Sequence, residues 1–332
     1  MRILIVSDAW FPQVNGVVRT LATLRDGLIE LGHAVETITP DRFRTVPCPS
    51  YPEIRLALTR MGTVGRMIDA AQPCAIHIAT EGPLGIAARR HCVKKGIPFT
   101  TAYHTRFPEY VETRWKVPLS WTYAFMRWFH GPAATVMVAT QTIEDALKAR
   151  GIGNIRRWSR GVDVEMFKPG DKSFLDLPRP ISLYVGRVAV EKGIEDFLRL
   201  DLPGTKVVVG DGPQLADLKR KFPDVHFAGR RSDNDLARYY AAADVFVFPS
   251  RTDTFGLVLL EALASGLPVA AYPVPGPLDV IDGSGAGVLD EDLGVAVRKA
   301  LDIPPAACRD HALRFSWDAC LQQFVGNLEV FA

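Results

Sequence analysis

The stretch that decides the fold reads ISLYVGRVAVEKG and spans residues 181–193. Its first five residues are mostly apolar and lack the alternation of a half-exposed strand, so they predict a strand buried on both faces. A glycine follows that strand, and a second one, Gly193, precedes the next apolar segment. A buried strand that passes through a glycine-containing turn into a helix is typical of a parallel α/β domain.

Strand-like and helix-like segments alternate on both sides of this stretch. In the second half the expected strands span 181–185, 206–209, 225–228, 244–248 and 268–271, with helices near 193–200, 213–222, 233–242 and 256–265. In the first half the expected strands span 3–7, 35–39, 75–79, 98–102 and 135–139, and a helix is expected at 17–31. Two such blocks in succession predict an α/β protein with two doubly wound, Rossmann-like domains.

A break in this pattern places the domain boundary. Residues 167–180 hold three prolines and a glycine and show no periodicity. We therefore expect an N-terminal domain over residues 1–168 and a second domain from residue 169. Two domains of this kind face each other across a cleft at the carboxyl ends of both sheets, which is the expected place for a nucleotide-type ligand.

The 332 residues have the composition of a folded globular protein, with 48% hydrophobic and 23% charged residues, which excludes disordered, collagen-like and coiled-coil classes. The formal net charge of +2 is unevenly spread: residues 1–170 carry 22 basic and 14 acidic side chains, and residues 171–332 carry 17 and 23. A basic half can mark an anionic partner, although chance scatter of surface charge gives the same counts.

Targeting and redox features indicate a cytoplasmic protein. The opening MRILIVSD is too short and too soon acidic for a signal peptide, and no run reaches the ~18 apolar residues of a membrane-spanning helix. Five scattered cysteines without a C-x-x-C pair favour a reducing compartment and argue against a structural zinc site or a disulfide framework.

Two cations follow the strand at 181–185. Arg187 and Lys192 lie in a strand-to-helix turn, where fixed positive charges beside a helix N-terminus form a good site for a diphosphate. The alternative is that both are ordinary solvated loop cations.

A second loop, after the strand at 244–248, carries Asp253 and Gly256 and opens an apolar helix. Gly256 lets the backbone approach a ligand closely, and the N–H groups of the helix start can receive phosphate oxygens. Glu261 is the only charged residue within 257–264, so its burial requires a partner. That partner is either a pair of sugar hydroxyls or an intraprotein Arg or Lys.

Three weaker features point to the same cleft. They are the glycine-rich turn at 210–212, the pair Asn15-Gly16 between the first strand and a helix, and His104 at the end of the strand at 98–102. Glycine-rich turns are common, and a lone histidine is more often structural than catalytic.

Together these segments resemble the family-4 glycosyltransferases of the GT-B fold. The resemblance runs from end to end of the chain and rests on Asn15-Gly16-Val17, Arg160-Gly161-Val162-Asp163, Gly186-Arg187…Lys192-Gly193, Gly210-Asp211-Gly212-Pro213, Asp253-x7-Glu261 and Phe315-Ser316-Trp317-Asp318. This chain departs from the family pattern at Asp253, where Glu is usual, and at Asn15-Gly16, where many relatives have two glycines.

The resemblance implies transfer of a hexose from a GDP- or UDP-linked sugar, with retention of anomeric configuration and with no metal or other cofactor. It implies that Arg187 and Lys192 hold the donor diphosphate, that Glu261 binds the ribose hydroxyls and that Asp253 binds those of the transferred sugar. It further implies that His104 lies near the donor sugar in the catalytic set. The residues it places near phosphate or sugar are Gly16, Gly212, Phe255, Gly256 and Leu257.

The resemblance also assigns roles to the domains. Residues 1–168 would bind the acceptor, residues 169–314 would bind the donor, and residues 315–332 would form a helix that packs back on the N-terminal domain. Two D-x-D matches, at 233–235 and 290–292, are typical of metal-dependent glycosyltransferases of another fold. Roughly one or two such matches are expected by chance, so we interpret both as surface.

The basic first domain holds three of the six tryptophans close together, Trp115, Trp121 and Trp128, with Arg127 beside them. Trp121 and Trp128 fall on one helical face with two phenylalanines. Aromatic and basic side chains together suit a helix at an anionic membrane surface, whereas a single stripe also suits a domain core. Relatives with a similar opening motif glycosylate diacylglycerol or phosphatidylinositol, so the resemblance implies a lipid acceptor.

Other functions stay open at this point. The same fold suits a nucleotide-sugar epimerase or hydrolase, a glycosyltransferase with a polysaccharide or small-molecule acceptor, and a nucleotide-sugar-binding protein without turnover. A dehydrogenase is disfavoured because neither 7–12 nor 186–193 contains G-x-G-x-x-G. Nothing in the sequence indicates a nucleic-acid partner.

Overall fold

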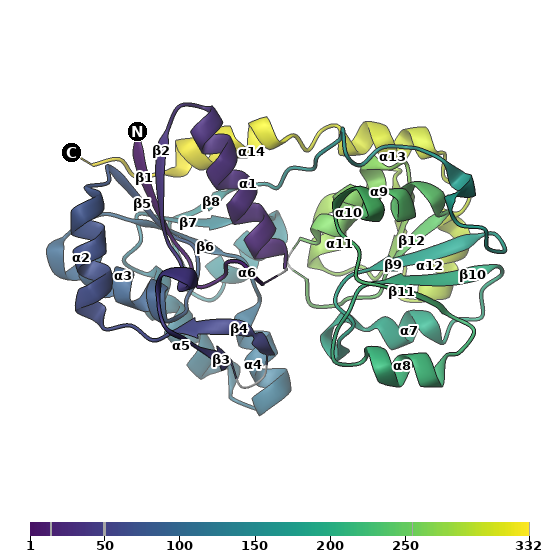
Figure 1. Cartoon of the computed structure of the whole chain (residues 1–332), viewed down its shortest axis with the longest axis horizontal. Helices are drawn as coiled ribbons and strands as arrows, with labels where there is room; N and C mark the ends of the chain where they lie inside the picture. Colours follow the sequence, from purple (N-terminus) through teal and green to yellow (C-terminus); the bar gives the residue numbers. More distant parts are fainter. Residues whose placement is uncertain (14, 49–50, 254, 332) are drawn as a thin grey trace. The chain divides into compact units, whose positions relative to one another are not determined.

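The computed structural model describes residues 1–13, 15–48, 51–253 and 255–331. By its internal contacts the chain divides into two compact units, which we call unit 1 (Met1–Ser159 with Cys320–Ala332) and unit 2 (Arg160–Ala319). The sequence places these divisions at residues 168 and 314, whereas the contacts place them at Ser159 and Ala319. Each unit contains a parallel sheet covered by helices (Figure 1).

Unit 1 is built on a six-stranded parallel sheet in the order β2-β1-β5-β6-β7-β8. Its strands are β1 (Arg2–Val6), β2 (Ala34–Ile38), β5 (Ala75–Ile78), β6 (Thr100–Tyr103), β7 (Thr135–Val138) and β8 (Ile155–Arg157). An antiparallel hairpin, β3 (Thr45–Cys48) and β4 (Tyr51–Ala57), lies outside this sheet. Strands β5, β6 and β7 are buried at every position, as expected for strands with helices on both faces.

The helices of unit 1 cover both faces of its sheet. They are α1 (Gly16–Glu30), the 3-10 helix η1 (Pro40–Arg42), α2 (Met61–Ala71), α3 (Pro83–Lys95), α4 (Phe107–Trp115), α5 (Leu119–His130), α6 (Gln141–Lys148) and α14 (Trp317–Asn327). On one face, Leu4 and Val6 of β1 share a core with α2, α3, α5 and α6. On the other face, α1 packs so closely on α14 that a Cβ atom at Gly27 would lie 2.6 Å from Leu321.

Unit 2 is built on a second six-stranded parallel sheet, in the order β11-β10-β9-β12-β13-β14. Its strands are β9 (Ile181–Val185), β10 (Thr205–Val209), β11 (His226–Gly229), β12 (Val245–Phe248), β13 (Val269–Ala271) and β14 (Gly287–Leu289). Counted along the chain this is the 3-2-1-4-5-6 order of the Rossmann fold. The strand order reverses between β9 and β12, and ligands of such sheets bind at the carboxyl ends of the strands beside that reversal.

Helices also lie on both faces of the unit 2 sheet. They are η2 (Lys172–Phe174), η3 (Val190–Lys192), α7 (Ile194–Leu198), α8 (Leu215–Lys221), α9 (Asp233–Ala242), α10 (Leu257–Ala264), α11 (Pro275–Ile281), α12 (Leu293–Ala300) and α13 (Pro305–Ala312). Tyr184 of β9 and Val245 of β12 enter a core shared with α7, α8 and α12.

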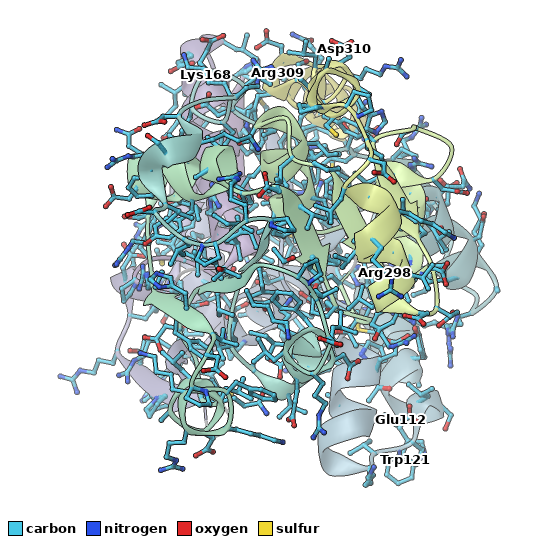
Figure 2. The ribbon with its side chains drawn as sticks, turned by 90° about the vertical axis from the view of Figure 1, so that its right-hand side faces the viewer. Glu112, Trp121, Lys168, Arg298, Arg309 and Asp310 are labelled. Carbon is cyan, nitrogen blue, oxygen red and sulfur yellow. The ribbon has the colours of Figure 1, made fainter. Side chains whose placement is uncertain are left out.

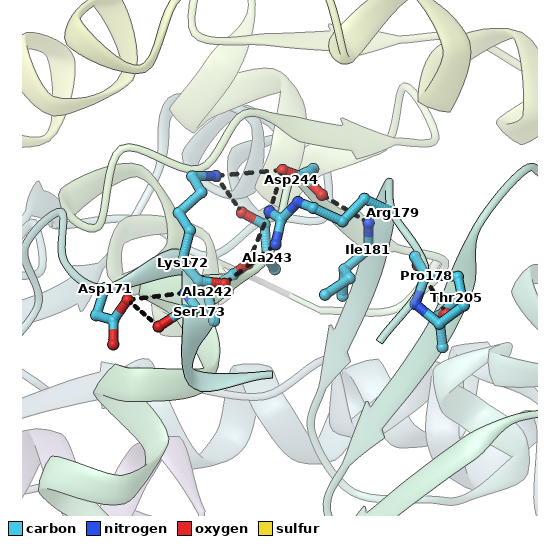
Figure 3. A network of polar contacts seen from close by, with 10 residues as sticks. All are labelled: Asp171, Lys172, Ser173, Pro178, Arg179, Ile181, Thr205, Ala242, Ala243 and Asp244. Atoms are coloured by element: carbon cyan, nitrogen blue, oxygen red, sulfur yellow. Dashed lines mark hydrogen bonds and ion pairs between the residues drawn. The ribbon is translucent and has the colours of Figure 1, made fainter. Parts of the chain in front are cut away.

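A polar network fixes the segment that leads into β9 (Figure 3). The Asp244 carboxylate accepts hydrogen bonds from the Ile181 amide, at 2.7 Å, and from the Arg179 guanidinium. Lys172 lies 3.3 Å from the same carboxylate and donates to the Ala243 carbonyl at 2.7 Å. Burial raises the pKa of Asp244, but the bonds from Ile181 and Arg179 and the nearby Lys172 together hold that pKa below its ordinary value. The proline-rich segment is therefore part of unit 2.

The strands and helices that the sequence predicts are all present, and their bounds agree to within two residues except at the C-terminal helix, which is predicted to reach residue 332 and ends at Asn327. The structure has four additional strands, namely β3, β4, β8 and β14. It also has helices whose bounds the sequence does not predict, namely α2, α3, α4, α6, α11, α12 and α13. The helix expected at 233–242 begins at Asp233, with Ser232 as its N-cap.

Candidate functional site

The loops after β9 and β12 lie side by side at the reversal of the unit 2 strand order. They carry the cations and carboxylates that the sequence singles out. The Thr252 hydroxyl, from the β12 loop, donates to the Glu191 carbonyl, from the β9 loop, at 3.1 Å. Because this bond joins the two loops, their side chains form one group at the carboxyl edge of the sheet.

A buried tyrosine stabilises the loop that carries Arg187. Tyr184 is 2% exposed, and its hydroxyl donates to the Arg187 carbonyl at 2.8 Å. Burial raises the pKa of Tyr184, which keeps the hydroxyl protonated and able to donate. Gly186 leaves room for this hydroxyl, because a Cβ atom at position 186 would lie only 2.8 Å from it. Contacts within unit 2 therefore fix the backbone at Arg187 without a ligand.

The turn that follows β10 packs against the same loop. The Val188 amide donates to the Asp211 carbonyl at 2.9 Å. A Cβ atom at Gly210 would lie 1.8 Å from the Gly186 carbonyl oxygen, and one at Gly212 would lie 2.4 Å from that of Val188. Close packing of two loops therefore accounts for both glycines. The donor contact of Gly212 stays a prediction.

Lys192 and Asp253 meet across the two loops. The Lys192 ammonium lies 2.5 Å from Asp253 Oδ1, and the two side chains are 23% and 20% exposed. The other carboxylate oxygen, Asp253 Oδ2, is buried and accepts no hydrogen bond within the described part of the chain. Asp253 thus binds the cation through one carboxylate oxygen, and its role toward a ligand stays a prediction.

The β12 loop ends at a glycine that begins a helix. Gly256 is the N-cap of α10 and adopts the left-handed conformation, with φ of +81°, which side chains other than glycine rarely adopt. The side chain of Phe255 is buried, and Gly256 and Leu257 are half-buried. The first amides of α10 and its positive dipole end therefore lie in the same loop as Asp253.

Glu261 is 3% exposed, and its Oε2 accepts a hydrogen bond from the Tyr240 hydroxyl at 2.9 Å. Sequence reasoning missed this partner, which comes from α9. It also missed Tyr184. For Tyr184 a signal exists, since the hydroxyl of a tyrosine within a buried strand needs a partner. For Tyr240 the spacing of α9 gives no such signal.

The predicted residues of unit 1 lie at the carboxyl edge of its own sheet. Gly16 is the first residue of α1, whose N-cap Asn15 accepts from the Val18 amide at 3.0 Å. His104 follows β6 and is half-buried, with its ring edge-on to that of Trp158 at 5.7 Å. Both positions are compatible with the donor roles that the family resemblance implies, and these roles stay predictions.

The aromatic stripe of α5 divides between core and surface. Phe129 is fully buried, whereas Trp121 is 72% and Trp128 39% exposed. Figure 2 shows Trp121 at the edge of the molecule. The Arg89 guanidinium lies 3.9 Å above the Trp128 ring. Arg127 is exposed, and it donates to the Arg150 carbonyl at 3.2 Å. The side chain of Trp115, at the end of α4, lies outside the described residues.

Neither D-x-D match lies in the loops of the candidate site. Asp292 caps α12 through the Gly294 and Val295 amides, and Asp290 pairs with Lys299 at 3.4 Å. No group of three or more His, Cys, Asp or Glu side chains with metal-binding geometry occurs in the ranges that the structure describes. Over the same ranges, every helix is too short or too polar to cross a bilayer.

A Rossmann-type unit with cations, a helix start and two carboxylates at its strand reversal defines a nucleotide-binding protein of the doubly wound class. Two family models match most of this chain. The model described as Glycosyltransferase Family 4 matches residues 14–166, and the one described as Glycosyl transferases group 1 matches residues 179–302.

Individual proteins with the same organisation are also similar. A GDP-mannose-dependent alpha-mannosyltransferase of Mycobacterium tuberculosis is 32% identical over 317 residues, which cover 87% of this chain and 83% of the relative. An alpha-monoglucosyldiacylglycerol synthase of Streptococcus pneumoniae is 29% identical, covering 92% and 79%. The solved structure of a sucrose-phosphate synthase from Thermosynechococcus elongatus shares the fold, with a TM-score of 0.77, 23% identity and coverage of 98% and 97%.

The chain belongs to the family-4 glycosyltransferases. Its fold is GT-B, and it is a glycosyltransferase that uses a nucleotide sugar. The resemblance drawn from the sequence motifs is confirmed at this level.

Proposed function

We propose that this protein transfers a hexose from GDP- or UDP-hexose to a membrane lipid such as diacylglycerol or phosphatidylinositol, with retention of configuration and with no metal. The bond between the anomeric carbon and the diphosphate oxygen breaks, and a bond from that carbon to an acceptor hydroxyl oxygen forms. The O–H bond of the acceptor breaks in the same step, and its proton passes to the departing diphosphate. The diphosphate then carries the negative charge that must be stabilised.

The Lys192–Asp253 pair is the observation that carries this proposal. Its geometry supplies a cation for the departing diphosphate and, on the same ion pair, an unused carboxylate oxygen for a sugar hydroxyl. Arg187 and the first amides of α10 add positive charge at the same edge of the sheet. These groups stabilise a leaving diphosphate without a bound divalent cation.

The remaining donor contacts follow from the family resemblance. We assign the ribose hydroxyls to Glu261, which Tyr240 orients, and the region of the donor sugar to His104 and Gly16. We assign no other cofactor.

The lipid acceptor is supported by two independent facts. One relative is an alpha-monoglucosyldiacylglycerol synthase, and unit 1 exposes a cluster of aromatic rings. We call the exposed rings of Phe107, Trp121 and Trp128 the aromatic surface; they are 40%, 72% and 39% exposed. The half-buried Phe125 links two of them, with ring centroids 6.4 Å from Phe107 and 5.7 Å from Trp128.

Basic side chains lie on the same helices and beside the Trp128 ring. Arg127 and Lys116 are exposed on the same helical pair, and Arg90 lies 5.8 Å from the Trp128 ring. Indole rings with nearby guanidinium groups favour the headgroup layer of an anionic membrane. We therefore propose peripheral association with the inner face of the membrane through α4 and α5.

Membrane association is tested with a pair of variants. Trp121→Ala combined with Trp128→Ala is expected to reduce sedimentation with anionic liposomes by about tenfold, because each ring removes apolar contact area from the bilayer. Leu58→Ala is the matched control, since Leu58 is 59% exposed elsewhere in unit 1. Equal binding by all three proteins contradicts the membrane role.

The reaction itself is tested by the release of nucleoside diphosphate from GDP-mannose and UDP-glucose, with and without diacylglycerol vesicles. Release that depends on the lipid supports the proposal. Equal release without any acceptor instead identifies a hydrolase. Conversion of the donor without diphosphate release identifies an epimerase, and release only with a sugar or polysaccharide acceptor identifies a non-lipid glycosyltransferase. Binding without any turnover identifies a nucleotide-sugar-binding protein.

A further inference from the structure

Unit 1 buries a carboxylate that the donor site does not use. Asp8 is the second residue after β1 and is 7% exposed. It lies at the carboxyl end of the strand beside which the unit 1 sheet reverses its order, between β1 and β5. A buried carboxylate at such an edge calls for a physical reason, because desolvation of a charge is costly.

Asp8 takes the place of an N-cap for a helix more than seventy residues away. Its Oδ1 accepts from the Leu84 amide at 2.8 Å, and its Oδ2 accepts from the Gly85 amide at 3.2 Å. The local N-cap of α3 is Gly82, which has no side chain to offer. A Cβ atom at Gly82 would lie 2.4 Å from Asp8 Cγ, so the glycine makes room for the distant carboxylate.

Thr80 locks the orientation of Asp8. The Thr80 hydroxyl accepts from the Asp8 amide at 2.7 Å and donates to Asp8 Oδ2 at 3.0 Å. One hydroxyl thus holds both the backbone and the side chain of the same residue. The loop after β1 is therefore fixed to the loop after β5 at its first positions.

The same loop continues to the start of α1 through side-chain amides. Gln13, which is 3% exposed, donates from Nε2 to the Asp8 carbonyl at 3.2 Å. Its Oε1 accepts from Asn15 Nδ2 at 3.3 Å. Asn15 in turn accepts from the Val18 amide in the first turn of α1. A continuous series of hydrogen bonds joins the start of α3 to the start of α1.

Burial of the Asp8 carboxylate lowers the stability of the folded protein. Burial raises the pKa of Asp8 to about 6, against the bonds from Leu84, Gly85 and Thr80, which lower it, and Glu81 raises it further. The carboxylate is nevertheless ionised at neutral pH, at a cost to the folded state. A neutral side chain caps a helix N-terminus at a lower desolvation cost than a carboxylate does. A carboxylate has several acceptor positions, so the presence of Asp8 is better explained by the fixed orientation that its hydrogen bonds impose on the loop.

We propose that Asp8 is a positioning residue for glycosyl transfer, which acts with Thr80 and Gln13 to fix the start of α1 and hence Gly16. This proposal rests on the donor role of Gly16 in the proposed function. Asp8 touches neither donor nor acceptor in this scheme, and it acts only through the loop.

Three variants separate positioning from folding. Asp8→Asn keeps the size of the side chain but loses one acceptor oxygen, Thr80→Val removes the hydroxyl at constant shape, and Thr80→Ser keeps the hydroxyl. We expect Asp8→Asn and Thr80→Val to lower kcat/KM for the nucleotide sugar, per folded molecule, by about tenfold or more. Thr80→Ser is expected to stay within about threefold of the wild type, because the two bonds to Asp8 are retained.

Two further measurements identify the origin of the effect. Binding of the nucleoside diphosphate alone is expected to change less than about threefold, since Arg187 and Lys192 belong to unit 2 and the phosphate contacts dominate that affinity. Hydrogen exchange of the amides at 15–20 is expected to accelerate in Asp8→Asn and Thr80→Val but not in Thr80→Ser.

Unchanged kcat/KM per folded molecule in both Asp8→Asn and Thr80→Val would overturn the proposal, and so would unchanged exchange at the start of α1. Equal losses in Thr80→Ser and Thr80→Val would also overturn it. A wild-type protein that transfers no hexose contradicts the proposed function instead. In that case the exchange measurement still decides whether Asp8 holds the start of α1.

Discussion

Replacement of Lys192 by alanine tests the donor site at its centre. The variant removes the cation that lies 2.5 Å from Asp253 and leaves that carboxylate, 20% exposed, without its counter-ion. Loss of one preorganised group that stabilises charge in the transition state costs about a hundredfold to a thousandfold in rate, or about 2.7–4 kcal/mol. Loss of one partner from a partly buried hydrogen-bonded pair costs about 1–3 kcal/mol of unfolding free energy. We therefore expect the loss in kcat/KM to exceed the loss in stability.

Lys172→Ala is the matched control for this experiment. Lys172 also pairs with an aspartate in unit 2, at 3.3 Å from Asp244, but it lies beside the entry to β9 rather than at the carboxyl edge of the sheet (Figure 3). Its side chain is 52% exposed, so its ion pair contributes about 0–1 kcal/mol. Both variants are compared with the wild type by donor kinetics and by denaturant unfolding. Activity of Lys192→Ala within about threefold of the wild type, or an equal loss in Lys172→Ala, refutes the assignment.

Three further perturbations have expected outcomes. Glu261→Gln is expected to raise the KM for the nucleotide sugar by about tenfold with little change in kcat, because it weakens contacts to the ribose rather than to the reacting bond; an unchanged KM rejects the ribose contact. The pKa of Asp8 is raised from 3.8 to about 6 in the folded protein. Protonated Asp8 therefore favours the folded state fully below pH 3.8, and this stabilisation is lost as pH rises through about 6. Unfolding free energies measured from about pH 4 to about pH 7 are expected to show the wild type losing about 2 kcal/mol relative to Asp8→Asn, and a difference independent of pH contradicts this. Asp244→Ala is expected to cost about 1–3 kcal/mol of unfolding free energy, since it leaves the Ile181 amide without its acceptor and removes the carboxylate from Arg179, which keeps the Lys172 and Ala242 carbonyls; full activity per folded molecule separates this structural role from catalysis, and a selective loss of activity does not fit it.

Local patterns suffice for most of the fold. The strands β1, β5, β7, β9 and β12 are short, mostly apolar runs, and the pattern of hydrophobic residues predicts them. The three-residue strands β8 and β14 are missed because they lie at sheet edges, where half-exposed side chains weaken the pattern. The β3–β4 hairpin is missed because Pro47 interrupts its first strand.

The sequence predicts the part of the candidate site whose charged residues and glycines lie close together along the chain. Arg187 and Lys192 are separated by a few residues in one turn, and Asp253 and Gly256 share the next loop, so their types and spacing point to a diphosphate. The Tyr240–Glu261 bond and the Asp8 cap of α3 join elements that are distant in sequence. Only the folded chain brings these groups together, and one sequence gives no local signal for them.

The most direct test of the donor site is calorimetric titration of GDP and of UDP into the wild-type protein, Lys192→Ala and Lys172→Ala. We expect the wild type and Lys172→Ala to bind one of the two nucleotides at one site with similar affinity. We expect Lys192→Ala to bind it at least about tenfold more weakly, because a charge-assisted contact to the diphosphate is lost. Failure of the wild type to bind either nucleotide, or equal affinity in all three proteins, contradicts the placement of the donor diphosphate at the carboxyl edge of the unit 2 sheet.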